Sequence, residues 1–187
     1  MPRLLFLISA LLIVAAVLAR GWYGKRIIAG YGGRRCRVNA GSWQSLFGEE
    51  VKAPAKEPSA AECGRALREA ALVQWEKENP AAFRGREAAR RFGLGVPPFT
   101  LVVVVFAVAV AKLAMFAAVA VVFAATALAV MFGLASLGTE LRAVAATTKL
   151  ARSRHVFPLQ EDEEAAIACA RAEVWMHTLP PILRWVS

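Results

Sequence analysis

The chain has 187 residues, of which 58% are hydrophobic, more than the roughly 45–50% typical of soluble domains. The excess lies in two blocks, residues 4–19 and 99–137. This pattern excludes a plain soluble enzyme, a disordered tail and a disulfide-rich secreted domain, and it predicts a small all-α integral membrane protein. The 23 basic and 14 acidic residues give a net charge of +9, which favours contact with anionic lipids, nucleic acid or an acidic protein.

Residues 1–20 predict an N-terminal transmembrane anchor. Their apolar run of 16 residues lies between Arg3 and Arg20 and is slightly short against the roughly 17–25 residues that cross a bilayer. We expect Trp22 and Tyr23 to extend the run into the membrane interface, where aromatic rings are enriched.

Two alternatives for this block stay open. Val17-Leu18-Ala19 has the small residues of a secretory cleavage site. An organelle-targeting segment also fits, because seven basic residues and no acidic ones precede Glu49, as in mitochondrial leaders. We expect an uncleaved anchor, because the run is long for the apolar part of a signal peptide.

Residues 21–97 predict a basic extramembrane segment. Residues 20–97 carry 15 Lys and Arg against eight Glu and no Asp, and residues 41–58 have the composition of a loop. We expect the arginines before the long apolar block either to fix topology or to bind lipid headgroups, whereas nucleic-acid binding would need interleaved aromatic residues. These headgroup candidates are Arg84, Arg86, Arg90 and Arg91.

Capping signals place two helices in this segment. Ser59 and Glu62 have the spacing of a capping box, which predicts a helix near 60–78. Asn79-Pro80 predicts its end and the start of a second helix near 81–92. The first helix is expected to have an apolar face and an opposite, charged face. The apolar face comprises Cys63, Ala66, Leu67, Ala70 and Val73, and the charged face comprises Arg65, Arg68, Glu69 and Glu76.

The long apolar block contains a single charge, Lys112, in residues 99–137. As one helix it would extend about 58 Å, against a hydrocarbon core of about 30 Å. Both flanks are basic and therefore favour the same side of the membrane. We therefore predict a transmembrane hairpin over residues 98–138, with Lys112 reaching the opposite interface. One long helix remains the alternative, because no Gly, Pro or Asn marks an internal turn.

Pro97-Pro98 is expected to start this hairpin, and Gly133 and Gly138 to mark its end. Alanines recur at helical spacing within it, and small residues allow close contact between membrane helices. The helix-packing candidates are Ala107, Ala111, Ala114 and Ala118, with a second set at Ala117, Ala120, Ala124 and Ala127.

Residues 139–187 predict an extramembrane tail with an amphipathic helix near 161–179. Four acidic residues at 161–164 suit the helix dipole, and Pro180-Pro181 ends the helix. Trp185 is a further interface candidate. The cysteines Cys36, Cys63 and Cys169 have no metal-site spacing and are expected to be small buried hydrophobic residues.

Sequence motifs for catalysis are lacking, so we expect no enzyme, no metal, cofactor or catalytic residues, and no small-molecule substrate. The layout of anchor, basic segment, apolar pair and the residues Leu137-Gly138-Thr139-Glu140-Leu141 resembles that of bacterial membrane zinc metallopeptidases. The metal-binding helix that defines that family is absent from this sequence, so the resemblance implies no activity.

We therefore expect a non-catalytic accessory or structural subunit of a larger membrane complex, of the respiratory or ATP-synthase type. The mitochondrial inner membrane is favoured and the bacterial plasma membrane is the alternative. Expected partners are other membrane subunits and anionic lipids such as cardiolipin, with no nucleic acid. The competing hypothesis is a stand-alone membrane protein, either a degenerate enzyme relative or a lipid-surface scaffold.

Overall fold

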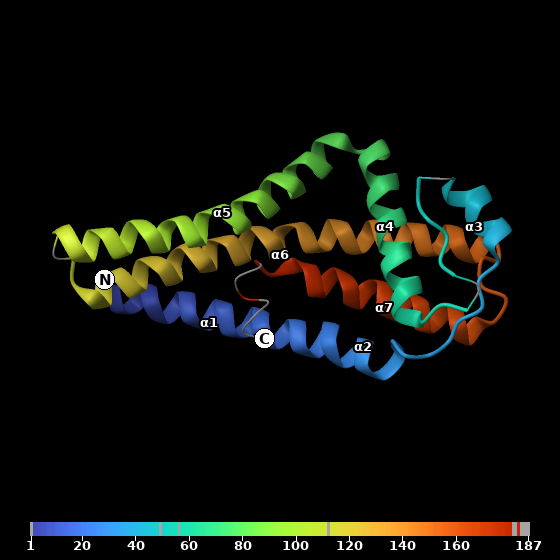
Figure 1. Cartoon of the computed structure of the whole chain (residues 1–187), viewed down its shortest axis with the longest axis horizontal. Coiled ribbons are helices and arrows are strands. Elements are labelled where there is room, and N and C mark those ends of the chain that lie inside the picture. Colours follow the sequence, from blue (N-terminus) through green and yellow to red (C-terminus); the bar gives the residue numbers. More distant parts are fainter. Residues whose placement is uncertain (1, 49, 56, 112, 181–182, 184–187) are drawn as a thin grey trace. The chain divides into compact units, whose positions relative to one another are not determined.

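The computed structural model in Figure 1 describes residues 2–48, 50–55, 57–111, 113–180 and 183. The protein is all-helical, with 83% of the chain in helices. Among the described residues there is no strand, and an isolated bridge pairs Arg35 with Ser59.

The chain forms two compact units. The apolar unit comprises Met1–Arg20, Arg84–Ser136 and Thr178–Ser187. The polar unit comprises Gly21–Phe83 and Leu137–His177.

The apolar unit contains α1 (Pro2–Arg20), most of α5 (Pro80–Ala111) and the first part of α6 (Met115–Ser153). The Phe6 ring of α1 lies with its centroid 4.8 Å from that of Phe123 on α6. On α5, Phe92 makes an edge contact with Phe132 of α6, at 5.1 Å between centroids. Helix α6 therefore contacts both other helices through aromatic rings, and it also meets α1 in an aliphatic cluster that includes Ala16 and Val130.

The long apolar block is divided between two helices rather than forming one. Helix α5 ends at Ala111 and α6 begins at Met115, and α6 runs back beside α5 (Figure 1). The chain reverses there without a glycine or proline, and the Leu113 N–H donates to the Ala107 carbonyl at 3.4 Å. Residue 112, the lysine to which we assigned an interface role, lies outside the described residues.

The expected boundary at Pro97-Pro98 is wrong. Both prolines lie inside α5, which is continuous over 32 residues, so the predicted helix near 81–92 is the first part of a longer one. Proline has no N–H and deprives the carbonyl four residues earlier of its partner, here at Gly93 and Leu94. Helix α5 changes direction along its length (Figure 1), as a proline kink predicts.

The expected end of the apolar helix at Gly133 and Gly138 is also wrong, because α6 continues for 39 residues to Ser153. Glycine costs only about 1 kcal/mol in a helix interior. At Gly133 the missing side chain has a packing role, since a Cβ there would clash with the Thr178 carbonyl oxygen.

The helix of the predicted anchor continues beyond Arg20 into the polar unit. A π-helical turn, η1 (Gly21–Lys25), leads into α2 (Arg26–Tyr31). Gly24 is buried in η1, and a Cβ at this position would meet the Met176 sulfur at 2.9 Å. The wider π turn therefore coincides with a close approach to α7 (Gln160–Thr178).

Helix α4 (Ala60–Glu78) begins and ends as its capping residues predict. Ser59 Oγ accepts from the Glu62 N–H at 3.2 Å, and Glu62 Oε2 accepts from the Ser59 N–H at 2.8 Å. Asn79 caps the next helix, because its Oδ1 accepts from the Ala82 N–H at 3.1 Å. The predicted capping box and the Asn79-Pro80 junction are thus confirmed.

The predicted loop over residues 41–58 contains a helix, α3 (Ala40–Phe47). Asn39 caps it by accepting from the Ser42 N–H, and Gly48 ends it with a φ of 69°. Trp43 is fully buried, and its indole N–H donates to the Val51 carbonyl. The glycine and serine content indicated a loop, but the burial of one tryptophan stabilises a helix.

The core of the polar unit is built where α4 packs against α7. Its buried residues include Cys63 and Leu67 of α4 and Ala166 and Cys169 of α7. Gly64 allows this contact, since a Cβ there would lie 2.6 Å from the Cβ of Cys169. The two helices therefore meet almost backbone to backbone.

We predict that Gly64→Ala lowers the free energy of unfolding by roughly 1–3 kcal/mol, because overpacking forces the helices apart. Gly138→Ala is the matched control, since Gly138 is helical and a Cβ there meets nothing within 4 Å. That change should raise stability by about 0.5–1 kcal/mol through helix propensity. Chemical unfolding of the detergent-purified chain measures both, and equal effects would contradict the packing account.

Candidate functional site

The largest feature of functional interest is the exposed apolar surface of three helical segments. Arg3–Tyr31, Pro80–Val110 and Met115–Ser153 are each long and apolar enough to cross a membrane. In their most apolar windows 17%, 17% and 33% of residues are buried, so most of these side chains face outward. Large side chains such as Leu11, Phe106 and Met115 are over 60% exposed. A surface of this kind is compatible with an integral membrane protein.

The four predicted headgroup arginines have different surroundings. Glu87 holds two of them, with Arg86 Nη1 at 2.9 Å and Arg90 Nη1 at 3.7 Å from its Oε1. The side chain of Arg86 is only 9% exposed, which leaves little surface for a lipid. Arg84 and Arg91 are exposed and remain accessible to headgroups.

The aromatic residues that follow α1 lie in the polar unit. Trp22 is 61% exposed, and the Arg26 guanidinium lies 4.4 Å from its ring centroid. Tyr23 stacks on Trp175 of α7 at 5.1 Å between centroids. Tyr23 therefore has a packing role in addition to the expected interface role. Trp185 lies outside the described residues.

The first predicted set of helix-packing alanines, at positions 107, 111, 114 and 118, does not lie on one helix. Ala107 and Ala111 belong to α5 and Ala118 to α6, while Ala114 lies between the two helices and is exposed. Ala118 is only 3% exposed. In the second set, which lies wholly on α6, Ala120 is 1% and Ala127 is 7% exposed, and the other two are half-buried. The second set thus supplies the more continuous packing face.

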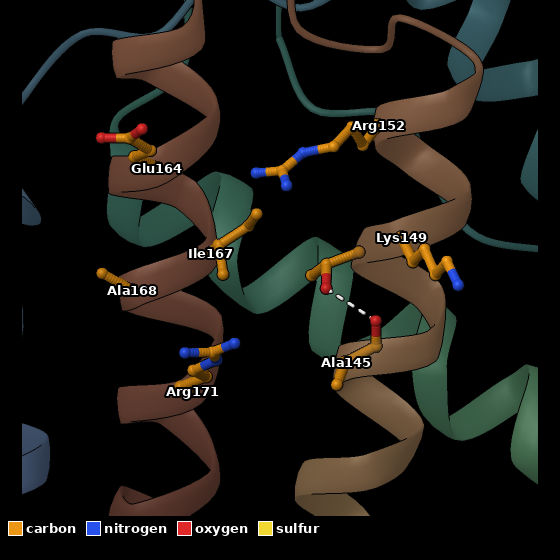
Figure 2. Close-up of a pocket in the computed structure, with 8 residues that line it drawn as sticks. Ala145, Lys149, Arg152, Glu164, Ile167, Ala168 and Arg171 are labelled. Atoms are coloured by element: carbon orange, nitrogen blue, oxygen red, sulfur yellow. Dashed lines mark hydrogen bonds between the residues drawn. The ribbon is translucent and has the colours of Figure 1, made fainter.

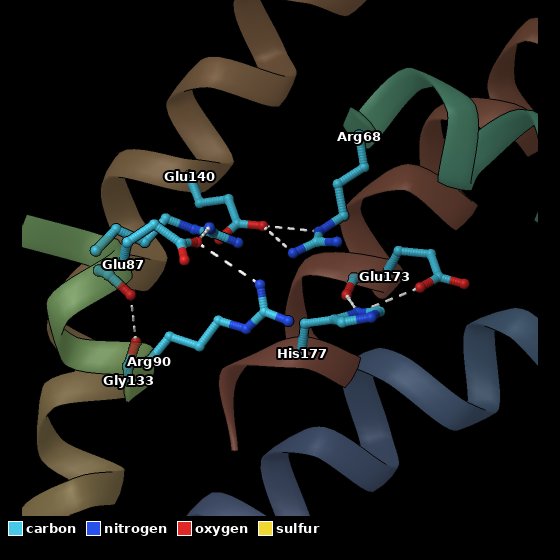
Figure 3. Close-up of polar contacts among 9 residues, drawn as sticks. Arg68, Glu87, Arg90, Gly133, Glu140, Glu173 and His177 are labelled. Atoms are coloured by element: carbon cyan, nitrogen blue, oxygen red, sulfur yellow. Dashed lines mark hydrogen bonds and ion pairs between the residues drawn. The ribbon is translucent and has the colours of Figure 1, made fainter. Parts of the chain in front are cut away.

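A buried ion pair links α4 to α6 in the polar unit (Figure 3). Both Nε and Nη2 of Arg68 lie 2.7 Å from Oε1 of Glu140. The side chains are 11% and 7% exposed. Sequence periodicity placed Arg68 on the charged outer face of its helix, which is wrong because α6 covers that side. Glu140 had no assigned role, and a lone acid between Thr139 and Leu141 gives no sequence signal for burial.

Two further buried carboxylates have partners within the polar unit. Asp162 Oδ1 accepts from Arg34 Nε at 3.3 Å, and its Oδ2 accepts from the Arg37 N–H at 3.0 Å. Glu173 lies 3.4 Å from His177 Nδ1 and 3.9 Å from Arg65 Nε (Figure 3).

The acidic start of α7 suits the helix dipole, as expected from the sequence, but Asp162 is also buried, at 3% exposed. It joins α7 to the chain before α3. Sequence spacing could not reveal this contact, because its partners lie more than 120 residues away.

The three cysteines are buried in the polar core, as predicted, and are free thiols. Burial raises the pKa of the Cys36 and Cys63 thiols and raises the pKa of Cys169 to about 11. Such thiols stay protonated near neutral pH and react poorly. Across the part of the chain that the structure describes, no three His, Cys, Asp or Glu side chains are grouped to hold a metal ion.

A groove of about 420 Å³ lies between α6 and α7 in the polar unit (Figure 2). Three basic side chains, Lys149, Arg152 and Arg171, and one acidic side chain, Glu164, line it. From the sequence, residues 140–154 were predicted to be a positively charged flank of the apolar block. Their spacing did not indicate a groove.

Comparisons of the chain with known protein families, with curated proteins and with solved structures found no match.

We predict that breaking the Arg68–Glu140 pair from either side is costly. Arg68→Met or Glu140→Leu should each lose about 3–5 kcal/mol of unfolding free energy, since each leaves a buried charge unpaired. The double variant should lose much less than the sum, because it removes both charges. Thermal unfolding of the four proteins forms a double-mutant cycle, and additive losses would contradict the pairing.

The alanine packing face generates a second prediction. Ala120→Leu should cost about 1–3 kcal/mol, because it adds bulk at a position with no free space. Ala114→Leu is the control and should change stability by less than about 0.5 kcal/mol, because this residue is exposed. Melting temperatures in one detergent compare the two, and a larger loss for Ala114→Leu would reverse our assignment of the packing face.

Proposed function

We propose that this protein is a non-catalytic accessory subunit of a larger membrane protein complex. The observation that carries the proposal is that three buried carboxylates of the protein are paired with arginines inside the fold. Glu140, Asp162 and Glu173 each contact an arginine of the polar unit. Carboxylates in such pairs hold helices together, and none of the three faces a pocket among the described cavities.

The apolar helices support a role within a membrane. The proposed arrangement has α1, α5 and α6 as three crossings, with α5 and α6 as the hairpin. Buried alanines such as Ala120 and Ala127 line α6, and small residues favour close helix packing in lipid. The outward side chains are available to lipid and to neighbouring subunits.

The proposal also places the basic segment and the C-terminal tail on one side of the membrane. Residues 21–83 and 137–177 share a single core and the Arg68–Glu140 pair, which a bilayer between them would prevent. By the positive-inside rule this is the cytoplasmic or matrix side. The exposed Arg84 and Arg91 then suit anionic headgroups such as those of cardiolipin.

The favoured location is the mitochondrial inner membrane, with the bacterial plasma membrane as the alternative. Its support is the lack of acidic residues before Glu49. A stand-alone membrane protein, either a degenerate enzyme relative or a lipid-surface scaffold, is the competing function.

Native gel electrophoresis after extraction in mild detergent, with mass spectrometry of the band, tests the proposal. The chain should migrate in a large assembly with the same partner subunits in repeated preparations. Migration as a free 20.1 kDa species under conditions that keep other complexes intact would overturn it.

Cysteine labelling tests the predicted topology. Cysteines introduced by Gly41→Cys and Ser153→Cys should react with a membrane-impermeant maleimide from the same side, since both positions are exposed. Ala114→Cys should react from the opposite side. The native cysteines are buried and give a low background. Opposite accessibility of positions 41 and 153 would refute the arrangement.

A further inference from the structure

The groove between α6 and α7 has more positive than negative charge. Lys149 and Arg171 are exposed, and neither has an ion pair within the described part of the chain. Arg152 is bound by Glu163 on α7. With Glu164 as the lining acid and Glu163 beside Arg152, the three cations and two acids leave a net charge of +1 among the described residues of the groove.

The cations are spread along the groove and do not converge on one point. Figure 2 shows α6 and α7 side by side, with Arg152 extending toward α7 at the level of Glu164 and Arg171 at the level of Ala145, while Lys149 extends along the far side of α6 at the edge of the groove. Each helix contributes two turns, or about 10 Å at 1.5 Å per residue. A single phosphate would need its donors gathered within hydrogen-bond reach of one centre, so this spread favours an elongated anion.

The groove lining also includes apolar side chains. Ala145, Ile167 and Ala168 are among the lining residues, and Ile167 points between the two helices (Figure 2). The Thr148 hydroxyl donates to the Ala145 carbonyl at 3.0 Å, so it is already satisfied inside the helix. Small residues on two adjacent helices allow a third helix to approach closely, as in helical bundles.

We propose that this groove binds an acidic amphipathic helix from a partner subunit. Carboxylates spaced three or four residues apart would face Lys149 and Arg171, and the small apolar residues of the partner would cover Ala145 and Ala168. The inference deepens the proposed function and rests on it, because it requires a partner chain. Unlike the apolar helices, this surface recognises its partner by charge.

A defined peptide tests the groove directly. The probe is a fluorescent 18-residue helix with Glu on one face and Ala on the other, titrated against the full-length chain in mild detergent. The double variant Lys149→Glu/Arg171→Glu should bind at least about tenfold more weakly, because attraction becomes repulsion. Wild-type binding should also weaken as salt rises, because exposed charges are screened.

Arg142→Glu is the matched control. Arg142 is an exposed cation of the same helix that does not line the groove, so this variant should bind the peptide as the wild type does. Circular dichroism should show that all variants keep their helical content. Peptide binding that the double variant leaves unchanged would overturn the proposal. So would binding of inorganic phosphate that the double variant abolishes, without binding of the peptide, because the groove would then be a phosphate site.

The native-gel experiment separates failure of the groove from failure of the proposed function. Co-migration of wild type and Arg142→Glu with the complex, and loss of the double variant from it, is the expected result. If the double variant is incorporated as fully as the wild type, the groove proposal fails while the accessory role stands. If the wild type migrates alone, the accessory role fails whatever the peptide does.

Discussion

The contact between α4 and α7 joins two parts of the chain that the whole apolar block separates in sequence. It depends on Gly64, whose missing side chain lets the helices meet at the backbone. Around this contact lie the buried thiols and the core of the polar unit. Because residues 21–83 and 137–177 must be on the same side to form it, this one contact also constrains how the chain can thread a membrane.

The buried charges of the polar unit follow from the same arrangement. Once α6 and α7 cover α4, Arg68 can be accommodated only with a partner, and Glu140 supplies it at 2.7 Å. Such a pair need not add net stability compared with apolar residues, yet either partner alone is costly. It therefore favours one alignment of α4 against α6.

The α6–α7 groove brings together two exposed cations that have no ion pair among the described residues. Elsewhere acids such as Asp162 are paired within the fold, whereas Lys149 and Arg171 point to no acid among the described residues. The apolar helices would place the protein in a lipid environment shared by many chains. A charged groove of defined length can distinguish among partners, because specificity comes from matching charge positions.

The sequence by itself determined the features that depend on neighbouring residues. The helices long and apolar enough to cross a membrane follow from apolar run length. The start of α4 follows from Ser59 and Glu62, and its junction with α5 from Asn79-Pro80, because capping acts over three or four residues. The alanine spacing also predicted small packing faces, although the reversal before Met115 separated the first set.

Tertiary structure alone decided what long-range packing controls. Pro97, Pro98 and Gly133 lie inside helices despite their local cost, and at Gly133 the close approach of Thr178 requires the missing side chain. Trp43 stabilised a helix in a loop-like segment, and Arg68 became buried because α6, distant in sequence, covers its face. The groove between α6 and α7 is also a product of long-range packing, because it exists only where the two helices place Lys149 and Arg171 along one surface. The local sequence determines where each helix tends to form. The burial of its side chains depends on which other helices pack against it, and only the assembled fold determines that packing.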